Sequence, residues 1–409
     1  MLGKGLTQMH VILSSIEFQM SLLLFVALAG YLIAYRIHQS AVVGIILAGI
    51  LVGPSFLHLV TYTDFVAGLA ELGAIVLLFT IGLEFEFRQI SNVKNFFIAL
   101  IGILLPWAAG FLVAKLFNFD FKASLLIGTA LTATSIAITA NVLKEMNKLQ
   151  TEVGKAIIGA AVIDDVLALL VLTMSEGIVT GNLSGWTILV TIIKAAGFII
   201  VGIAFGRLVL NKLLIKIDQT KIAAKFPETV FIFAMMTAFL YGVVAQIAGL
   251  SAIVGAFLAG ISFTGVGLKH GKSFKDGAEY LQVIFASVFF ISLGILLDIH
   301  TVTWELALFI GVLIVIASLS KVIGCGLPAK LFGFSWKDSF AVGVGMVPRG
   351  EVAMIVALLG LTQNLITDRA YSALVFMALI TTIITPIIFR NWLFRGENKK
   401  ITVIIEKES

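Results

Sequence analysis

Thirteen apolar stretches joined by short polar loops account for most of this 409-residue chain. Hydrophobic residues make up 60% of it and charged residues 12%, whereas a soluble domain carries roughly 25% charged residues. A helix needs roughly 20 apolar residues to cross a bilayer. The sequence therefore predicts an all-α polytopic membrane protein with about 13 transmembrane helices. The stretches are roughly 17–36, 40–58, 66–86, 96–117, 122–145, 153–176, 187–210, 226–247, 250–268, 278–296, 303–332, 337–361 and 369–393.

The lysines and arginines predict how this chain is oriented. With the N-terminus outside, 21 of the 28 lie on the cytoplasmic side, 4 on the outer side and 3 within the stretches. Such a bias is typical of cytoplasmic loops, so we expect an N-terminus outside and a C-terminus in the cytoplasm. The net charge of +5 therefore reflects topology, and no nucleic-acid partner is expected. The first apolar run, Met20–Tyr35, lacks a small-residue cleavage site, so no cleaved signal peptide is expected.

The basic connector Val209–Lys225 follows the seventh stretch and leaves six stretches before that stretch and six after it. With alternating crossings, the two halves enter the membrane from opposite sides. This parity permits two inverted six-helix repeats, the architecture of many secondary transporters, whose site lies at the midplane between the repeats.

Asp164 and Asp165 are adjacent in the apolar stretch Gly154–Met174. An ionised carboxylate at the centre of a bilayer costs about 3 kcal/mol on insertion scales, and two neighbours repel each other. Adjacent helix residues point about 100° apart, so one carboxylate can face a water-filled cavity while the other faces a neighbouring helix. A membrane helix carries such a pair only if an ion, a proton or a buried cation compensates the charge.

Lys321 is the lysine that lies deep within an apolar stretch, the eleventh. We expect it to pair with Asp164, which leaves Asp165 to face an ion. A salt bridge that only holds two helices together would also account for Asp164 and Lys321, but it would not account for Asp165. Ionisable residues inside a membrane mark ion and proton paths.

The fifth and twelfth stretches are expected to be interrupted at mid-span. In the fifth, Thr132, Thr134 and Ser135 either allow close helix packing or, in an unwound segment, offer oxygen atoms to a hard cation. In the twelfth, Pro348 removes a helix hydrogen bond and clashes with the preceding turn. Each stretch is the fifth of its half, and corresponding interruptions point to a transport site.

Arg349 and Glu351 lie beside the break expected at Pro348. We expect a structural role for these residues, either capping the half-helices or pairing with Glu71 near the outer end of the third stretch. None of the five histidines lies deep in a stretch, so a metal cluster is not expected.

Several of these motifs occur together: ALTATS at 130–135, GAAVIDD at 159–165, Phe289-Phe290 with Gly294, Lys321, and GMVPRGEV at 345–352. In combination they resemble the monovalent cation:proton antiporter-2 family, above all its bacterial Na+/H+ antiporters. The resemblance covers essentially the whole chain. A double aspartate, a lysine in the eleventh of thirteen spans and a Pro-Arg-Gly-Glu motif form a specific combination.

The resemblance implies two crossed, broken helices in a core domain that moves like an elevator against a separate dimerisation domain. It implies a homodimer. The implied divisions are 1–94 and 226–300 for the dimerisation or scaffold helices, 95–180 and 301–393 for the ion-transporting core, 181–225 for a linker helix and cytoplasmic loop, and 394–409 for a cytoplasmic tail.

By motif match, Asp165 binds the ion and the proton, so a metal ion at Asp165 is transported Na+ and no resident cofactor is expected. Asp164 is the partner of Lys321, and the residues Thr132, Thr134 and Ser135 lie near the ion. In this superfamily a double aspartate goes with electrogenic exchange.

The predicted function is secondary active exchange of Na+ or Li+ for H+ across a bacterial inner or plasma membrane, with monovalent cations, protons, lipids and a second copy as partners. K+/H+ or mixed Na+/H+–K+ exchange stays open, because selectivity depends on ligand geometry that a sequence does not show. The chain is not expected to be an enzyme. An intramembrane aspartyl protease needs its two aspartates on different helices. A symporter of organic anions would not need a set of two aspartates and a lysine.

Overall fold

The computed structural model describes residues 15–86, 92–269 and 271–394. All regular structure in these residues is helical, and nine of the helices found there are long and apolar enough to cross a membrane. Shorter apolar helices account for the other stretches, so every predicted stretch corresponds to one helix or to consecutive helices of the described residues. The prediction of an all-α polytopic membrane protein is therefore confirmed. Residues 395–409 of the predicted tail and residues 1–14 lie outside the described part of the chain.

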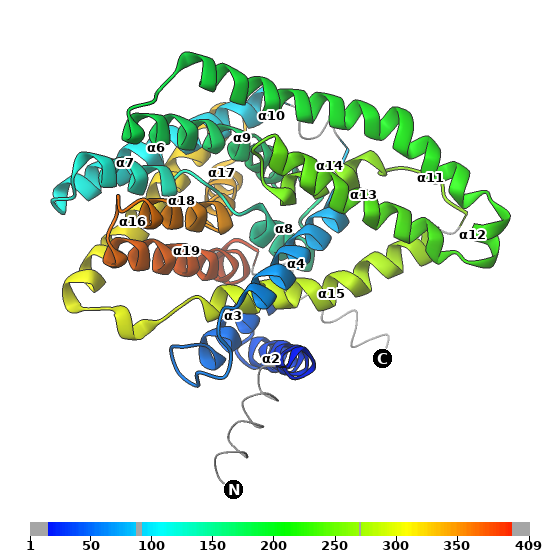
Figure 1. Ribbon diagram of the computed structural model, residues 1–409, viewed down its shortest axis with the longest axis horizontal. Coiled ribbons are helices and arrows are strands. Elements are labelled where there is room, and N and C mark those ends of the chain that lie inside the picture. Colours follow the sequence, from blue (N-terminus) through cyan, green and yellow to red (C-terminus); the bar gives the residue numbers. More distant parts are fainter. Residues whose placement is uncertain (1–14, 87–91, 270, 395–409) are drawn as a thin grey trace, which may run out of the picture.

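Six helices contact mainly one another and form what we call the scaffold bundle. In Figure 1 its members α13 and α14 lie on the right and α2 and α3 lie at the bottom. The members are α2 (Ile16–Arg36), α3 (Ala41–Val52), α4 (Asp64–Gly82), α13 (Glu228–Ile247), α14 (Ala252–Ser262) and α15 (Gly271–Ile295).

The remaining apolar helices form a second group, the core bundle, which gathers on the left of Figure 1. Two of its spans are broken into pairs of half-helices, α7–α8 and α17–α18. The members are α6 (Val93–Leu116), α7 (Phe121–Ala130), α8 (Ile136–Glu145), α9 (Glu152–Thr180), α16 (Trp304–Leu331), α17 (Trp336–Gly345), α18 (Glu351–Thr362) and α19 (Asp368–Ile388), which continues into the π-helical turn η3 (Phe389–Leu393).

One long helical segment connects the two bundles and runs along the upper edge of Figure 1. It consists of α10 (Gly185–Phe205), the π-helical turn η1 (Gly206–Leu210) and α11 (Asn211–Asp218). It contacts α9 of the core bundle and α13 and α14 of the scaffold bundle. Two short elements complete the chain, α12 (Lys221–Lys225) before α13 and η2 (Ile299–Thr301) before α16.

Helix contacts repeat between the two halves of the chain. The pair α2–α3 in the first half corresponds to α13–α14 in the second, α6–α7 to α16–α17, and α6–α9 to α16–α19. Helices α4 and α15 correspond to each other and are also in contact with each other, and the same is true of α6 and α16. Corresponding helices are seven crossings apart and therefore run in opposite directions, so the contacts describe an inverted repeat.

The repeat is also visible in the sequence of its best-matched helices. The segment SAVVGIILAGI at 40–50 matches SAIVGAFLAGI at 251–261 in eight of eleven positions. The shared glycines allow equivalent close approaches, because a methyl group at Gly44 or Gly255 would overlap the preceding helix of the same half. A methyl group at Gly49 would overlap α15, and one at Gly260 would overlap α4. Small residues at such crossings are typical of membrane helices.

Hydroxyl and carboxylate side chains fix where several helices begin. Thr63, Asp120, Thr151 and Thr303 each accept a hydrogen bond from a backbone N–H in the first turn of α4, α7, α9 and α16. Each such cap stabilises a helix by about 0.5–2 kcal/mol.

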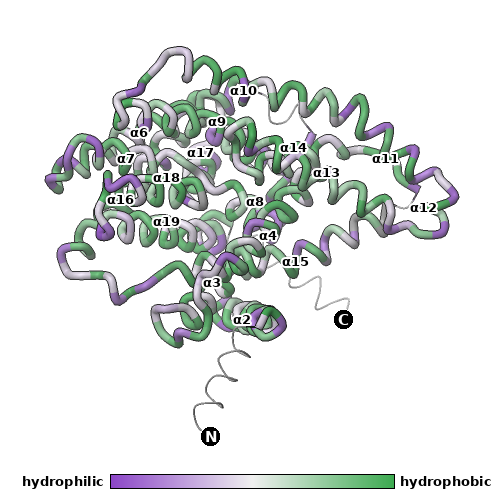
Figure 2. Tube along the Cα trace, in the orientation of Figure 1, coloured by the Kyte–Doolittle hydropathy of each residue, from purple (hydrophilic) through white to green (hydrophobic). Residues whose placement is uncertain are grey.

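The helices consist mainly of apolar residues, as the green segments of Figure 2 show, and the polar residues gather at loops and helix ends. Large side chains such as Phe25, Leu112 and Val201 are more than half exposed. A soluble protein rarely exposes such a continuous apolar surface, whereas acyl chains of a bilayer would cover it.

We predict that Gly260→Ala lowers the melting temperature in detergent by several degrees. Its methyl group would overlap the backbone of α4 at Phe79, and overpacking of this kind costs typically about 1–3 kcal/mol. Gly311→Ala on α16 is the matched control, because nothing lies within 4 Å of its new methyl group and alanine favours a helix by about 1 kcal/mol over glycine. Equal melting temperatures for the two variants would contradict the close approach.

Candidate functional site

The two broken spans cross in the middle of the core bundle. Helix α7 ends at Ala130 and α8 begins at Ile136, while α17 ends at Gly345 and α18 begins at Glu351. Both predicted interruptions are therefore present. Backbone N–H and C=O groups that lose their helical hydrogen bonds inside a membrane need new partners. Here each interrupted span provides hydrogen-bond partners for the other.

Three hydrogen bonds join the breaks. The Ser135 backbone N–H donates to the Pro348 carbonyl oxygen at 2.8 Å. The Thr134 hydroxyl donates to the Met346 carbonyl oxygen at 3.3 Å, and the Thr139 hydroxyl donates to the Gly345 carbonyl oxygen at 2.7 Å. The hydroxyl residues of the fifth stretch therefore hold the unwound part of the twelfth.

Arg349 is completely buried at this crossing. Its guanidinium donates to the carbonyl oxygens of Met346 and of Ala317 on α16, each at 3.2 Å. The Met346 carbonyl lies just after the C-terminus of α17, where a positive charge is favourable. Arg349 thus caps a half-helix, one of the two structural roles expected for it.

Glu71 does not lie at the broken helix, contrary to the expectation. It is on α4 of the scaffold bundle, and its carboxylate accepts a hydrogen bond from the Gln246 side chain at 2.9 Å. Gln246 belongs to α13, which packs against α4. The Arg349 guanidinium does not reach Glu71, because it donates to backbone carbonyl oxygens inside the core bundle. Glu351 begins α18, and its side chain is outside the described part of the structure.

Asp164 and Lys321 form an ion pair between α9 and α16. The Lys321 Nζ atom lies 2.6 Å from Asp164 Oδ1, and neither side chain is exposed at all. Gly102 of α6 makes room beside the pair, since a methyl group there would overlap Cys325 and lie 3.8 Å from Lys321 Nζ.

Asp165 faces away from this pair, as its position one residue further along the helix requires. Its side chain is 9% exposed and lines a cavity of about 640 Å³ between the two bundles. A smaller recess of this cavity is lined by Thr134, Ser135, Asp165 and Ser251. These side chains offer the carboxylate and hydroxyl oxygen atoms that a hard cation prefers.

Thr132 is the predicted ligand that the structure places elsewhere. Its hydroxyl donates to the Thr129 carbonyl oxygen at 2.7 Å, and it lines neither the cavity nor the recess. In the last turn of a helix, a threonine hydroxyl satisfies a carbonyl of the preceding turn, which turns Thr132 away from Asp165.

The cavity opens on the side where α4 begins and where α13 is followed by α14. Asp64 and Glu71 of α4 lie along it. No lysine or arginine is among the described residues of its lining. Its charged groups are therefore all acidic, which favours entry of a cation.

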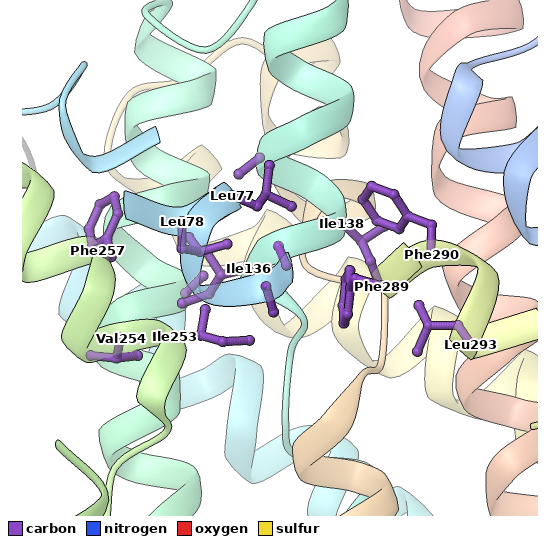
Figure 3. Close-up of a cluster of buried hydrophobic side chains, with 14 of the residues drawn as sticks. Leu77, Leu78, Ile136, Ile138, Ile253, Val254, Phe257, Phe289, Phe290 and Leu293 are labelled. Carbon is purple, nitrogen blue, oxygen red and sulfur yellow. The ribbon is translucent and has the colours of Figure 1, made fainter. Parts of the chain in front are cut away.

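An apolar layer between the bundles lies at the inner end of this cavity. Figure 3 shows Ile136 and Ile138 of α8 facing side chains of three scaffold helices, and all of these side chains are buried. The scaffold residues are Leu77 and Leu78 of α4, Ile253, Val254 and Phe257 of α14, and Phe289, Phe290 and Leu293 of α15.

Beyond this layer, the far end of α8 is bound to the scaffold bundle through Glu145. Its carboxylate accepts hydrogen bonds from the Ser40 hydroxyl and from the Ala41 backbone N–H, the latter at 3.2 Å. Arg390 of η3, which follows α19, lies 3.6 Å from the same carboxylate. Glu145 therefore occupies the N-terminus of α3, a position that favours an anion.

Lys144 and Asn141 of α8 contribute to this closure as well. Lys144 Nζ lies 3.3 Å from the Glu84 carboxylate and donates to the Gln282 side chain at 3.2 Å. Gln282 in turn donates to Asn141 at 3.4 Å. Among the described residues, the polar contacts and the apolar layer together close the route from Asp165 to this face, whereas Asp165 lines the cavity that opens on the opposite side.

Comparison with known proteins identifies this arrangement. The family described as "Sodium/hydrogen exchanger, transmembrane" matches residues 22–395. The chain belongs to this family. It is therefore a membrane exchanger of a monovalent cation for protons and not an enzyme, as predicted.

Two curated relatives of this exchanger match over nearly their full length. A protein of Enterococcus hirae named "Na(+)/H(+) antiporter" is 33% identical over 371 residues, which cover 90% of this chain and 96% of that protein. A protein of Bacillus cereus named "Na(+)/H(+)-K(+) antiporter GerN" is 31% identical over 375 residues, with 90% and 94% covered.

The exchanger fold is also seen in a solved structure. The sodium proton antiporter MjNhaP1 from Methanocaldococcus jannaschii superposes with a TM-score of 0.72 at 17% identity, covering 92% of this chain and 96% of that one. At this identity the likeness concerns the fold alone.

The Asp164–Lys321 pair yields a prediction about stability. Lys321→Met leaves Asp164 buried without its cation, which costs about 3–5 kcal/mol, so the melting temperature of the exchanger in detergent should fall sharply. Adding Asp164→Asn removes the unpaired charge and should recover most of the loss. Lys194→Met, at an exposed lysine of α10, is the control. If Lys321→Met were no less stable than this control, the pair would contribute nothing to folding.

Proposed function

We propose that this chain exchanges Na+ for protons electrogenically, with Asp165 as the carboxylate that both cargoes share. The observation that carries the proposal is the division of the two aspartates. Asp164 is neutralised by Lys321 in a site without exposure, whereas Asp165 lines an acidic cavity beside the hydroxyls of Thr134 and Ser135. The names of the Enterococcus and Bacillus relatives support Na+ as cargo.

The proposed cycle moves two protons against one Na+. Binding of Na+ displaces the proton of Asp165. A second proton leaves Lys321 when Asp164 turns from the lysine toward the bound ion, and it returns when the pair re-forms. One net charge then crosses per cycle, so a membrane voltage of 100 mV changes the driving force by about 2.3 kcal/mol.

We propose an elevator movement in which the core, 95–180 and 301–393, carries Asp165 past the scaffold helices of 1–94 and 226–300. The segment 181–225 links the two. The apolar layer of Figure 3 supports this division, because a layer without polar contacts is the surface along which one bundle slides most easily over the other. A second copy packs against the scaffold helices to make a homodimer within the lipid.

We propose a bacterial cell membrane as the location, with the N-terminus outside and the C-terminus, including 394–409, in the cytoplasm. The distribution of 21 basic residues against 4 supports this orientation. The cavity beside Asp165 then faces outward, and the contacts of Glu145 and Lys144 close the cytoplasmic side.

A second candidate cargo is K+, alone or together with Na+. The name of the relative GerN, "Na(+)/H(+)-K(+) antiporter", favours it. Proton flux in proteoliposomes, followed with a pH-sensitive dye while Na+, Li+ or K+ is added in turn, separates the candidates. A response to Na+ and Li+ alone supports the first, and a response to K+ as well supports the mixed exchanger.

We predict that Asp165→Asn abolishes cation-driven proton flux in that assay, because an amide neither binds the proton nor attracts the cation. Asp64→Asn, at an exposed acid of the same cavity, should keep at least a substantial part of the flux. In the unaltered protein the half-saturating Na+ concentration should rise as the pH falls, since protons and Na+ compete for one carboxylate. Normal flux in Asp165→Asn would refute the assignment.

We predict that Glu145→Gln loosens the closed face. The amide cannot pair with Arg390 and accepts less strongly from the N-terminus of α3, so a loss of roughly 1 kcal/mol would open this face about fivefold more often. The measurement is maleimide labelling of Ser287→Cys, a buried position on this side, in a Cys325→Ala background. Glu279→Gln, at an exposed site, is the control. Equal labelling rates would argue against Glu145 as part of the closure.

A further inference from the structure

An apolar groove of about 430 Å³ lies between α10 of the linking segment and α13 of the scaffold bundle. At its inner end the helices are held together, because the Tyr241 hydroxyl of α13 donates to the Gly202 carbonyl oxygen of α10 at 2.7 Å. Just beyond this bond, a methyl group at Gly206 would overlap Ser262 of α14. In the other direction α10 has open space beside it, since a methyl group at Gly197 would meet nothing within 4 Å. The groove is therefore closed at its inner end and hollow above it.

The groove is about as long as one leaflet of a bilayer. Its lining follows α10 from Lys194 to Phe205, a stretch of helix that rises roughly 16 Å. The hydrocarbon of one leaflet is about 15 Å thick, half of the bilayer core. On the groove walls, Val201 is 65% exposed and Ile247 is 72% exposed. The groove thus faces the acyl chains around these helices and matches their length.

A lysine lies at the outer rim of this groove. The helices are antiparallel, and Tyr241 of α13 is opposite Gly202 of α10. Two turns further out, Lys194 is therefore level with Ala248, the residue at which α13 has ended. This rim lies at the membrane surface on the side to which the Asp165 cavity opens.

Lys194 has no acidic partner in the described part of the chain. It is the only charged residue of α10 and of the described lining of the groove, and its side chain is exposed. None of the ion pairs between described residues includes it. A lysine at the edge of the hydrocarbon keeps its ammonium group at the level of the lipid headgroups, so a negative charge from the lipid can meet it there.

We propose that this groove is a binding site for an anionic phospholipid of that leaflet, with one acyl chain between α10 and α13 and its phosphodiester against Lys194. The apolar walls take the chain, and the ammonium group binds the phosphate as a point charge. Because α10 contacts α9 of the core as well as α13 and α14 of the scaffold, a lipid held there stabilises the junction between the bundles. The proposal does not depend on the proposed exchange at Asp165.

Two substitutions test the charge and the hollow separately. Lys194→Gln removes the charge at the rim, and Gly197→Leu places a side chain in the open space of the groove. Lys122→Gln is the control for the charge, at an exposed lysine at the start of α7. Gly311→Leu is the control for the hollow, because a methyl group at this glycine of α16 also meets nothing within 4 Å and the apolar hollow around it has no charged residue in its described lining.

The measurement is the rise in melting temperature of the delipidated protein in detergent when lipid is added. Anionic phosphatidylglycerol is compared with zwitterionic phosphatidylcholine of the same acyl chains. A ligand that binds the folded state raises its stability, and only the rise is compared, so effects on the lipid-free variants cancel. Phosphatidylglycerol should give the larger rise in the unaltered protein. Lys194→Gln should need about fivefold more of it for half of the rise, and Gly197→Leu should lose most of the rise with either lipid.

The two controls should respond as the unaltered protein does. Equal rises with both lipids in the unaltered protein would overturn the proposal, since the groove would then not select an anion. The same half-effect concentration in Lys194→Gln and Lys122→Gln would overturn the role of Lys194. A full rise in Gly197→Leu would place the lipid outside the groove.

A photoreactive residue identifies the occupant in native membranes. With p-benzoylphenylalanine in place of Val201 on the groove wall, illumination should attach phospholipid to the single chain, enriched in phosphatidylglycerol over the bulk membrane. Adding Lys194→Gln should remove this enrichment. A covalent dimer as the main product would show that a second copy of the chain covers the groove, and an adduct of bulk lipid composition would show that no lipid is selected; either result overturns the proposal.

Discussion

The buried ion pair between Lys321 and Asp164 determines what the rest of the core bundle can do. Two adjacent carboxylates in a membrane helix would otherwise compete for the same protons and cations. The lysine neutralises one of them in a site without exposure, and small residues such as Gly102 make the room it needs. Breaking such a pair is costly, so the pair fixes the rotation of α9 about its axis. That rotation is what turns Asp165 toward the cavity and the recess.

The same helix rotation brings Asp165 beside the two broken spans, whose geometry limits how the molecule can move. Each break satisfies backbone groups of the other through Ser135, Thr134 and Thr139, and Arg349 ties the break between α17 and α18 to α16. Separating them would leave buried polar groups without partners. The core bundle should therefore move as one unit, and the surface that can yield is the one between the bundles. There the contacts described above are the apolar layer and the polar contacts around Glu145.

Sequence patterns were sufficient for the spans, the two breaks and the partner of Lys321, because each depends on one dominant cost. Burying an unpaired charge or an unsatisfied backbone group costs several kcal/mol, so few arrangements of Asp164, Lys321 and Pro348 remain. The positions of Thr132 and Glu71 could not be obtained in this way. The hydroxyl of Thr132 and the carboxylate of Glu71 can each reach several hydrogen-bond partners nearby. The partner that each one binds depends on helix rotations that differ by small energies. Glu145 was also missed, since an acid at a helix end looks like an ordinary solvated residue.

The inverted repeat shows how a symmetric scaffold serves an asymmetric task. Helices α3 and α14 begin alike, yet the carboxylates near them differ. Glu145 has Arg390 as a permanent counterion and lies near the end of a helix, so its contact with α3 does not depend on cargo. Asp165 has no cationic side chain in the described lining of its cavity, so a bound cation or a proton is what balances its charge. One helix start thus closes a face of the molecule, whereas its counterpart begins beside the cavity through which the cargo reaches Asp165.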